Sequence, residues 1–496
     1  IDGRSCVLAA GEKMDFNFTP FRETAEDKVW VEAGGTPSVD WNRMFKYMRY
    51  YPHSCSEQIC SKGLTLLYAL QNLSEENYGK AREMIPQMID DLYSRQRSDG
   101  GILYWPGTGK SNEWVSSMAL EFLAAARAEG FQVAGDVVNA LVKYQRNCVN
   151  AYKRSTGYAL DDLAQAYRLF SLAVSGNADE ASMNRLKLGG ELSWPATMML
   201  ASAYSACGKA AVGKEIIDAF GDNSKEWTPS DMTFGSSLRD NAIMLEALVR
   251  TGDISAAVSH AAEIIRNYDA AYWNTQESFF IAKAFRELSA KVTKDKIKAD
   301  ASNSKSKSER NGVITWNIDS SAGMTSVTNN SAGPVFVRFT AVSQPSPDTA
   351  VKEASNGGLE LNVRYTGLED ITVDPAEMVQ GDEFTAVITV SNCSATGNFS
   401  NLALTYLIPS GWEIINDRLT GTEENDGRYD RLDIRDDRVL LYFDLPMNTY
   451  KKFRIRLRAA YEGDYILPSA SCECMYDRSV NACTASERCK VTRLGE

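Results

Sequence analysis

Residues 51–58 read Tyr51-Pro52-His53-Ser54-Cys55-Ser56-Glu57-Gln58. They contain the pattern Cys-x-Glu-Gln immediately before a long helical pattern. A spacing of three residues places the Cys55 thiol and the Gln58 carboxamide on the same side of one helical turn. There the sulfur can take over the acyl group of Gln58 with loss of ammonia, which leaves an internal β-cysteinyl-γ-glutamyl thioester. Such a bond is inert while shielded and reacts with amines and hydroxyls when exposed. A buried core thiol is the alternative interpretation of Cys55, because cysteine is among the most commonly buried residues.

The chain has 496 residues, enough for three or more domains with ample core. Its 53 Lys and Arg residues against 65 Asp and Glu give a net charge of −12, which argues against nucleic acid or an anionic membrane as a main partner. The sequence shows no apolar run of transmembrane length and no signal-peptide pattern. It begins without methionine in what reads as a β segment, so we expect it to be a piece of a longer protein.

The ten cysteines are too sparse for a disulfide scaffold. If Cys55 forms a thioester, an odd number remains, so at least one more is unpaired. Cys472 and Cys474 lie on one face of an expected strand and are poorly placed to pair with each other. No Cys-x-x-Cys pair or histidine cluster suggests zinc, and we expect neither a metal nor a cofactor.

Hydrophobic periodicity divides the chain into a β region, a helical region and a second β region. Residues 1–38 contain short alternating runs split by glycine and proline, which is typical of strands. From Trp41 to about Ala290 apolar residues recur at three and four positions, in segments joined by Gly-rich turns such as Asp99-Gly100-Gly101. We expect about ten to twelve antiparallel helices that stack in a ring as an α/α toroid.

A Lys- and Ser-rich stretch from about 291 to 312 reads either as a linker or as an exposed pair of strands. After it the hydrophobic period is two, as in Val335-Phe336-Val337-Arg338-Phe339. The final region of about 140 residues fits one β-sandwich. Insertion of a helical domain into a small β-domain, followed by a sandwich, would produce this order.

The stretch at residues 51–58 resembles the thioester motif of the α2-macroglobulin and complement family, in its bacterial branch. Other stretches resemble the same family in the same order over nearly the whole chain. In the helical region these are Gly100-Gly101-Ile102-Leu103-Tyr104-Trp105-Pro106-Gly107 before Asn112-Glu113-Trp114, then Ser236-Ser237-Leu238-Arg239-Asp240 and Asn274-Thr275-Gln276-Glu277. In the final region they are Pro409-Ser410-Gly411-Trp412-Glu413-Ile414, Asp433-Ile434-Arg435-Asp436-Asp437-Arg438-Val439, Gly463-Asp464-Tyr465-Ile466-Leu467-Pro468 and Met475-Tyr476-Asp477.

The resemblance implies four parts. They are the first half of a CUB-like β-domain at 1–38, a helical α/α-toroid thioester domain at 39–290, the second half of the CUB-like domain at 291–352, and a macroglobulin or receptor-binding-like β-sandwich at 353–496. Family members also have upstream macroglobulin domains and a bait region. When a protease cuts the bait, they change conformation, trap the protease and couple it covalently through the thioester. The resemblance therefore implies a protease inhibitor rather than an enzyme. It also implies a periplasmic or cell-surface location, with a lipoprotein anchor in the full-length protein.

The resemblance also assigns roles within the motif. Cys55 would carry the acyl group and leave as a thiol, and Gln58 would supply the acyl carbon. Glu57 has two interpretations: its carboxylate helps to form the bond or polarises the site, or it is an ordinary first-turn acid favoured by the helix dipole. Because water must be kept out, we expect aromatic side chains around the bond. The candidates, for which a plain core role is the alternative, are Tyr50, Tyr51, Tyr104 and Trp105.

The chain departs from the family pattern at two places. Many relatives have glycine before the cysteine, where a tight turn with positive φ would favour it, and this chain has Ser54. Some family members use a histidine on a later helix to form an acyl-imidazole, which favours hydroxyl targets. His260 falls far beyond the expected place, so we expect direct attack by amines, meaning lysine side chains of the trapped protein.

Other function classes fit parts of the pattern. A member of the family that has lost the thioester would serve as an adhesion or scaffold module. A Cys-His hydrolase is disfavoured, because Cys55 and His53 at i, i+2 would not face each other on a helix. α/α toroids also carry carbohydrate-active enzymes that use paired carboxylates. The acids near loops, which form no distinguishing motif, are Asp161, Asp162, Asp231 and Asp240.

Overall fold

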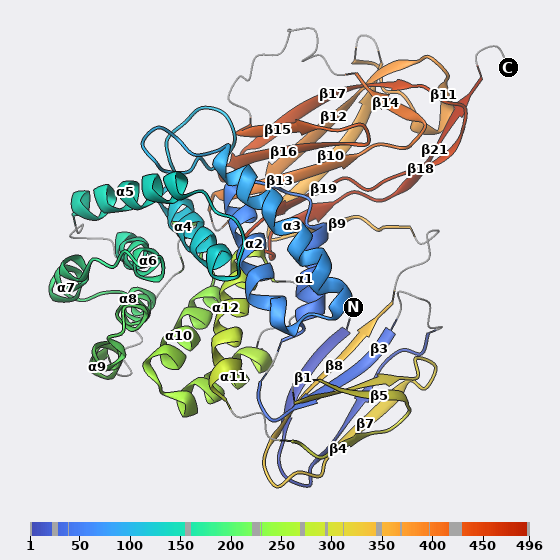
Figure 1. Cartoon of the computed structure of the whole chain (residues 1–496). Coiled ribbons are helices and arrows are strands. Elements are labelled where there is room, and N and C mark those ends of the chain that lie inside the picture. The colour runs from blue at the N-terminus through green and yellow to red at the C-terminus, as the bar shows by residue number, and fades with distance from the viewer. Residues whose placement is uncertain are drawn as a thin grey trace. The chain divides into compact units, whose positions relative to one another are not determined.

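The computed structural model describes residues 2–21, 28–37, 39–153, 160–220, 229, 231–267, 273–292, 296–310, 312–343, 350–367, 370–395, 397–415 and 429–493. The chain forms two compact units, residues 1–344 and 345–496 (Figure 1). Unit 1 holds the helices and one set of strands, and unit 2 holds strands. The predicted combination of one long helical region with β regions on both sides is confirmed.

Strands from both sides of the helical region form one β-domain in unit 1. One sheet has the order β1-β8-β3-β6-β5 and a smaller one the order β2-β7-β4. Val31 on β3 pairs with Phe339 on β8, and the rings of Phe16 and Phe339 stack 5.2 Å apart in the shared core. The helices are therefore inserted between β3 and β4. The strands are β1 (Asp2–Leu8), β2 (Lys13–Asn17), β3 (Lys28–Gly34), β4 (Ala299–Ala301), β5 (Ser304–Arg310), β6 (Val313–Ile318), β7 (Met324–Asn329) and β8 (Val335–Val342).

The Lys- and Ser-rich stretch forms strands rather than a linker. β5 lies at the edge of the larger sheet, pairs with β6, and exposes every residue along its length. Charged side chains on an edge strand discourage pairing with another chain, and Lys305 and Lys307 stand there. A strand exposed in this way needs no hydrophobic alternation, which explains why its sequence left the two alternatives open.

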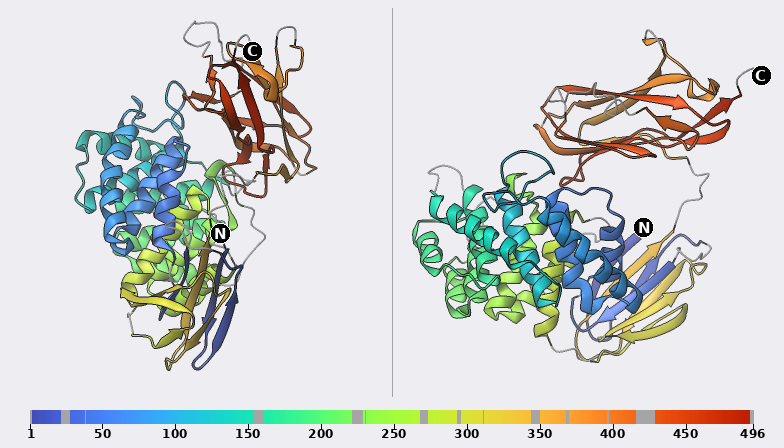
Figure 2. Two further views of the ribbon diagram at one scale, coloured as in Figure 1. Left: turned by 90° about the vertical axis from the view of Figure 1, so that its right-hand side faces the viewer. Right: turned by 45° about the horizontal axis from the view of Figure 1, so that its top comes forward.

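Twelve α-helices lie between β3 and β4 in the part of the chain that the structure describes. Six of them, α2, α4, α6, α8, α10 and α12, each pack against the next, and α12 packs back against α2, so that they close a ring. The others flank this ring, as α3 does on α2 and α9 on α8 (Figure 1, with two further views of the ribbon in Figure 2). The helices are α1 (Trp41–Tyr50), α2 (Ser56–Ala69), α3 (Glu75–Tyr93), α4 (Glu113–Ala128), α5 (Gly135–Ala151), α6 (Leu160–Val174), α7 (Glu180–Leu188), α8 (Trp194–Ala206), α9 (Ala210–Phe220), α10 (Ser237–Thr251), α11 (Ile254–Asn267) and α12 (Thr275–Lys291).

Burial of each helix follows its place in this arrangement. In α2 every residue except Lys62 is buried, because α1, α3, α4 and α12 all pack against it. α3 instead buries a single stripe whose members lie about one turn apart, as an amphipathic helix does. The Cys-x-Glu-Gln pattern therefore lies at the start of a helix that other helices enclose.

Unit 2 is a β-sandwich, as the alternating sequence predicts. Its larger sheets have the orders β10-β12-β17-β14 and β15-β16-β13-β19-β20-β9, and a small one has the order β11-β21-β18. β17 exposes and buries alternate residues, and the rings of Phe384 and Trp412 meet 4.8 Å apart in the core. The strands are β9 (Ala354–Asn356), β10 (Leu359–Thr366), β11 (Met378–Val379), β12 (Glu383–Asn392), β13 (Phe399–Leu407), β14 (Trp412–Ile414), β15 (Arg431–Ile434), β16 (Arg438–Leu445), β17 (Tyr450–Ala459), β18 (Gly463–Leu467), β19 (Ser471–Cys474), β20 (Asn481–Cys483) and β21 (Glu487–Thr492).

Candidate functional site

Cys55 and Gln58 meet at the start of α2. Cys55 is the N-cap residue, with an extended backbone (φ −65°, ψ 167°) that lets the chain enter the helix from the loop at 51–54. Gln58 folds its side chain back along the helix, and its Oε1 accepts a hydrogen bond of 2.9 Å from the backbone N–H of Cys55. This arrangement is a capping box, in which the third helical residue satisfies the backbone of the N-cap. Both side chains are fully buried. The two residues that the motif pairs are therefore neighbours in a turn closed to solvent.

The loop after α3 covers this turn. The N–H of Ser56 donates a hydrogen bond of 2.9 Å to the carbonyl of Tyr104, and the Ser56 hydroxyl donates to the carbonyl of Leu103. Arg95, itself buried, donates from Nη1 to Ser56 Oγ at 3.1 Å. The first N–H groups of a helix lack partners within it. Here the carbonyl of Tyr104 is the acceptor for one of them, the N–H of Ser56. The loop at 103–105 is therefore fixed to the residue that follows Cys55.

Aromatic rings line the same loop. Tyr104 and Trp105 are half-buried, with ring centroids 5.4 Å apart. The ring of Phe234 also stacks on that of Tyr104, at a centroid distance of 5.6 Å and an interplanar angle of 12°. The sequence gives no signal for Phe234, because it belongs to no periodic segment and lies far from the motif along the chain.

Tyr51 is held beside the motif and Tyr50 is not. Lys62 donates from Nζ to the carbonyls of Tyr51 at 2.7 Å and His53 at 3.3 Å, which fixes the loop before Cys55. The Tyr51 ring meets the buried His53 ring at 5.2 Å. The side chain of Tyr50 is 66% exposed at the end of α1, beside the guanidinium of Arg49, a position that gives its predicted shielding role no support.

Glu57 is fully buried and its carboxylate binds the start of α12. Oε1 accepts from Gln276 Nε2 at 2.7 Å, Oε2 accepts from Thr275 Oγ1 at 3.0 Å, and Ser61 of α2 also donates to Oε1. The carboxylate thus lies near the N-termini of two helices, where the peptide dipoles favour a negative charge. Thr275 and Gln276 stand out in the sequence as a helix start, but nothing there links them to Glu57.

The two departures from the family pattern have structural explanations. Ser54 is not among the described non-glycine residues with positive φ, so its position does not call for glycine. His260 lies on α11, with Nε2 3.1 Å from the carbonyl of Asn241 on α10 and Nδ1 3.9 Å from Glu263. Burial lowers the pKa of His260. These contacts are those of a histidine that packs one helix against its neighbour.

No disulfide joins any of the ten cysteines, all of which lie within the described residues. Cys60 follows Cys55 in α2, and burial, with a smaller contribution from Glu57, raises its pKa well above the ordinary value. Because the thiolate is the reactive form, Cys60 is a packing residue. Cys472 and Cys474 face the same buried side of β19, as their spacing predicts.

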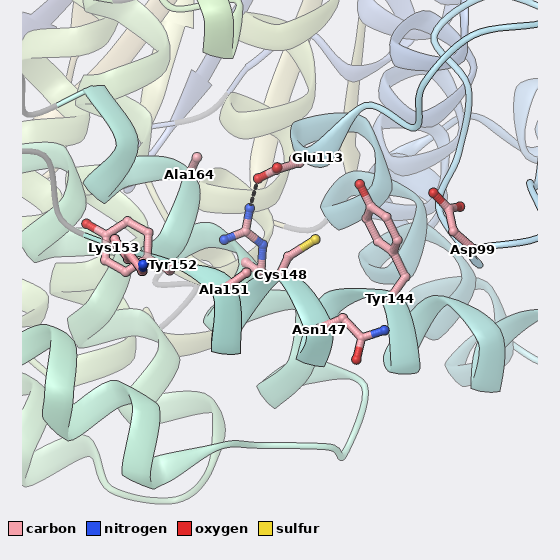
Figure 3. A pocket seen from close by; sticks show the side chains of 10 residues that line it. Asp99, Glu113, Tyr144, Asn147, Cys148, Ala151, Tyr152, Lys153 and Ala164 are labelled. Atoms are coloured by element: carbon pink, nitrogen blue, oxygen red, sulfur yellow. Dashed lines mark hydrogen bonds and ion pairs between the residues drawn. The ribbon is translucent and has the colours of Figure 1, made fainter.

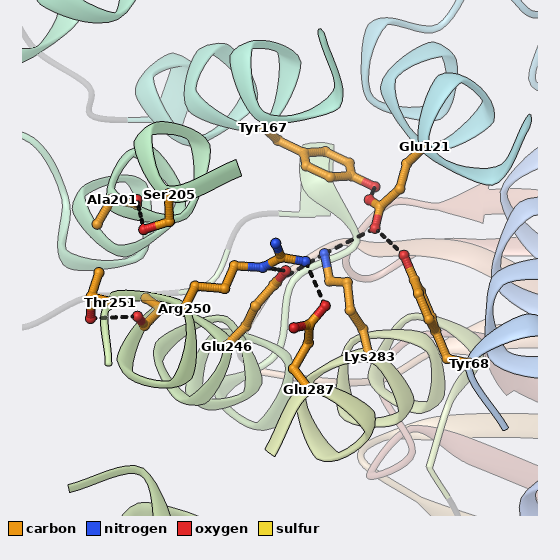
Figure 4. A network of polar contacts seen from close by, with 11 residues as sticks. Tyr68, Glu121, Tyr167, Ala201, Ser205, Glu246, Arg250, Thr251, Lys283 and Glu287 are labelled. Atoms are coloured by element: carbon orange, nitrogen blue, oxygen red, sulfur yellow. Dashed lines mark hydrogen bonds and ion pairs between the residues drawn. The ribbon is translucent and has the colours of Figure 1, made fainter. Parts of the chain in front are cut away.

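A chain of charged side chains crosses the middle of the ring of helices (Figure 4). At its centre the ammonium of Lys283 lies 3.1 Å from Glu121 Oε1 and 2.9 Å from Glu246 Oε2, with all three side chains buried. These contacts are ion pairs without well-directed hydrogen bonds. The flanking members of the network, contributed by α2, α6, α10 and α12, are Tyr68, Tyr167, Arg250 and Glu287.

A cavity of about 480 Å³ lies between α5 and α6, and its lining does not include the capping box (Figure 3). Its two carboxylates already have structural partners. Asp99 accepts from Ser111 Oγ at 2.8 Å, and Glu113 forms an ion pair with the buried guanidinium of Arg168. These engagements give no support to an acid–base pair of the glycosidase type.

The acids singled out in the sequence are likewise structural where they are described. Asp162 accepts from the backbone N–H of Ser193 at 2.7 Å and so ties α6 to the start of α8. Asp240 is fully buried against Arg239, with Oδ1 2.5 Å from Nε. The side chains of Asp161 and Asp231 lie outside the described residues. Among the described residues, no group of three or more His, Cys, Asp or Glu is placed to hold a metal ion.

No helix in the described ranges is long and apolar enough to cross a membrane.

Comparisons with known proteins agree on one family. A family profile described as the bacterial α2-macroglobulin MG10 domain matches residues 358–478. The α2-macroglobulin of Escherichia coli K12 is 24% identical over 524 residues, covering 96% of this chain and 30% of the relative. A Yersinia pestis α2-macroglobulin homolog is 22% identical over 508 residues, covering 91% of this chain and 25% of the relative. The chain thus spans a third or less of the length of these relatives.

Solved structures show the same fold. The crystal structure of native E. coli α2-macroglobulin from domain MG7 to the C-terminus superposes with a TM-score of 0.81 at 22% identity, covering 99% of this chain and 81% of that one. A Salmonella α2-macroglobulin reacted with methylamine gives a TM-score of 0.82 at 22% identity, covering 99% of this chain and 33% of that one. Over nearly its whole length the chain is therefore similar to the C-terminal portion of bacterial α2-macroglobulins, and residues 358–478 match the MG10 domain of that family.

Proposed function

We propose that this chain is the thioester-bearing C-terminal part of a bacterial α2-macroglobulin-like protease inhibitor. The observation that carries the proposal is the fold-back of the Gln58 carboxamide onto Cys55 in a fully buried first turn. In this proposal the ring of helices is an α/α toroid, and the split β-domain of unit 1 is the CUB-like domain into which it is inserted. Upstream macroglobulin domains with a bait region would complete the protein, in the periplasm or at the cell surface.

The chemistry needs only this chain and an amine. The Cys55 sulfur attacks the Gln58 amide carbon, ammonia leaves, and a thioester forms. A lysine amine of a trapped protease then attacks the same carbon, the C–S bond breaks, and an amide joins Gln58 to the protease. The thiolate of Cys55 leaves at a helix N-terminus, where the dipole favours negative charge. Until then the enclosed turn keeps water away from the bond.

Methylamine treatment of the native chain tests the proposal. We expect the untreated chain to be lighter than its sequence by one ammonia, and methylamine to add to Gln58 while one new thiol appears at Cys55. Intact mass and thiol titration measure both. The control is Cys60→Ala, which removes another buried thiol of the same helix and should leave the mass deficit and the methylamine reaction unchanged.

Cys55→Ala should abolish both the mass deficit and the uptake of methylamine. A native chain of full sequence mass, with Cys55 already titratable, would contradict a closed bond. If a longer chain with the upstream domains gave the same result, the protease-coupling function would be wrong and a thioester-silent adhesion or scaffold module would remain.

We also expect the bond to prefer amines to hydroxyls. The described contacts of His260 are with α10 and with its own helix, and no acyl-imidazole step is invoked. Without it the stronger nucleophile, an unprotonated amine, should react directly. Competition between methylamine and glycerol, followed by mass spectrometry of the peptide containing Gln58, measures the preference. Efficient coupling to glycerol but not to methylamine would overturn it.

A further inference from the structure

Phe234 has a strained backbone next to the site. Its φ is +50°, a conformation that large L-residues rarely adopt, and its side chain is only 5% exposed. Strain of this kind persists only where surrounding contacts impose it, and such residues cluster at functional sites. The contacts that impose it here can be named.

A buried guanidinium fixes the residue before Phe234. Arg239 donates from Nη1 to the carbonyl of Thr233 at 2.8 Å and from Nη2 to the Thr233 hydroxyl at 3.3 Å. Arg239 is itself fully buried, paired with Asp240, and its guanidinium lies 5.2 Å from the ring centroid of Trp114. Since its donors are directed by these partners, the guanidinium can hold Thr233, and thus Phe234, in one conformation.

Phe234 in turn braces the loop above the thioester turn. Its ring stacks on Tyr104, and the carbonyl of Tyr104 accepts the N–H of Ser56, the residue after Cys55. A continuous set of contacts therefore runs from Arg239 through Thr233, Phe234 and Tyr104 to the first turn of α2.

The same segment is tied to the helix that holds Glu57. Ser236 Oγ donates to Glu277 Oε1 at 2.6 Å, and Glu277 forms the capping box of α12 with Asn274. Thr275 and Gln276, which lie between Asn274 and Glu277, bind the Glu57 carboxylate. The segment 233–239 thus joins the loop on one side of the motif to the helix start on the other.

We propose that Phe234 is a positioning residue for the thioester: set by Arg239 through Thr233, it keeps the loop at 103–105 closed over Cys55 and so controls how fast water and small amines reach the bond. This proposal rests on the proposed function, because it assumes the thioester between Cys55 and Gln58. Its structural part, closure of the loop over the first turn of α2, stands on the contacts alone.

The test compares Phe234→Ala with the wild-type chain. We expect thiol release at Cys55, with and without methylamine, to be roughly tenfold faster in the variant. This is the change in rate that corresponds to losing the stabilisation of one buried aromatic stacking contact. Phe234→Tyr keeps the ring and should keep the wild-type rates. Phe131→Ala is the matched control, because it also removes a half-buried aromatic ring, one that packs against the guanidinium of Arg82.

Two results would overturn the proposal in distinguishable ways. If the wild type releases a thiol with methylamine and Phe234→Ala does so at the same rate, the positioning role of Phe234 is wrong while the proposed function stands. If neither the wild-type chain nor a longer chain with the upstream domains holds a thioester, the proposed function fails, and the rate at which iodoacetamide alkylates the Cys55 thiol then tests the positioning role of Phe234. Faster alkylation in Phe234→Ala, with faster hydrogen exchange at the Ser56 N–H, would support it, and unchanged rates would refute it.

Discussion

Lys283→Met should lower the free energy of unfolding of unit 1 by about 3–5 kcal/mol, the cost of removing one partner from a buried ion pair. Methionine fills nearly the same volume, so the loss reports the charge. Glu121 and Glu246, both buried, would lose the cation that lies within 3.1 Å of each. Glu246 would keep Arg250, whose Nε is 2.8 Å away, whereas the partners that Glu121 would keep within the described residues are the hydroxyls of Tyr68 and Tyr167. The larger part of the loss should therefore come from Glu121.

Scanning calorimetry can measure this loss, because the two units offer an internal reference. The transition of unit 1 should shift while that of unit 2 stays in place. Adding Glu121→Gln to Lys283→Met removes the stranded charge and should restore part of the stability, a non-additive result in a double-mutant cycle. Lys209→Met is the matched control, since its ion pair with Glu180 is solvent-exposed and worth little. Equal behaviour of Lys283→Met and Lys209→Met would mean that the network does not stabilise the ring.

The burial of Lys283 could not be predicted from the sequence. A lysine in a helical pattern is normally assigned to the solvated face, because lysine is almost never buried unless paired. Its burial depends on carboxylates from α4 and α10, and only the closed ring brings those helices to α12. Periodicity predicts that helices form and where, since it is a local property, but not which polar side chains meet across the ring.

The first turn of α2 likewise has features that the sequence predicts and features that it does not. The spacing of Cys55 and Gln58 is local, and the sequence alone predicts that they share one helical turn. The contacts of Glu57 with Thr275 and Gln276 span 218 and 219 residues and carry no local signal. Tyr50 and Tyr51 are adjacent aromatics that the sequence cannot tell apart. The end of α1 decides between them, since it leaves the first exposed and turns the second toward Lys62.

Glu57→Ala should lower the free energy of unfolding of unit 1 by at least about 3 kcal/mol, because it leaves three buried donors without their acceptor at about 1–3 kcal/mol each. Those donors are Thr275 Oγ1, Gln276 Nε2 and Ser61 Oγ, and none is exposed. Calorimetry measures the loss, with Glu75→Ala as a control that removes an exposed first-turn acid from α3.

Glu57→Gln separates the two roles that the sequence leaves open. The carboxamide keeps the shape and one acceptor oxygen, but it turns an N–H₂ group toward donors, so we expect a smaller loss of stability. Since the described contacts commit both carboxylate oxygens to α2 and α12, we infer that Glu57 positions the motif. The folded variant should then release as much Cys55 thiol with methylamine as the wild type. A chain of wild-type stability whose Cys55 is free from the start would instead show that the carboxylate takes part in closing the bond. Glu57 would then act in the chemistry itself, in addition to joining α2 to α12.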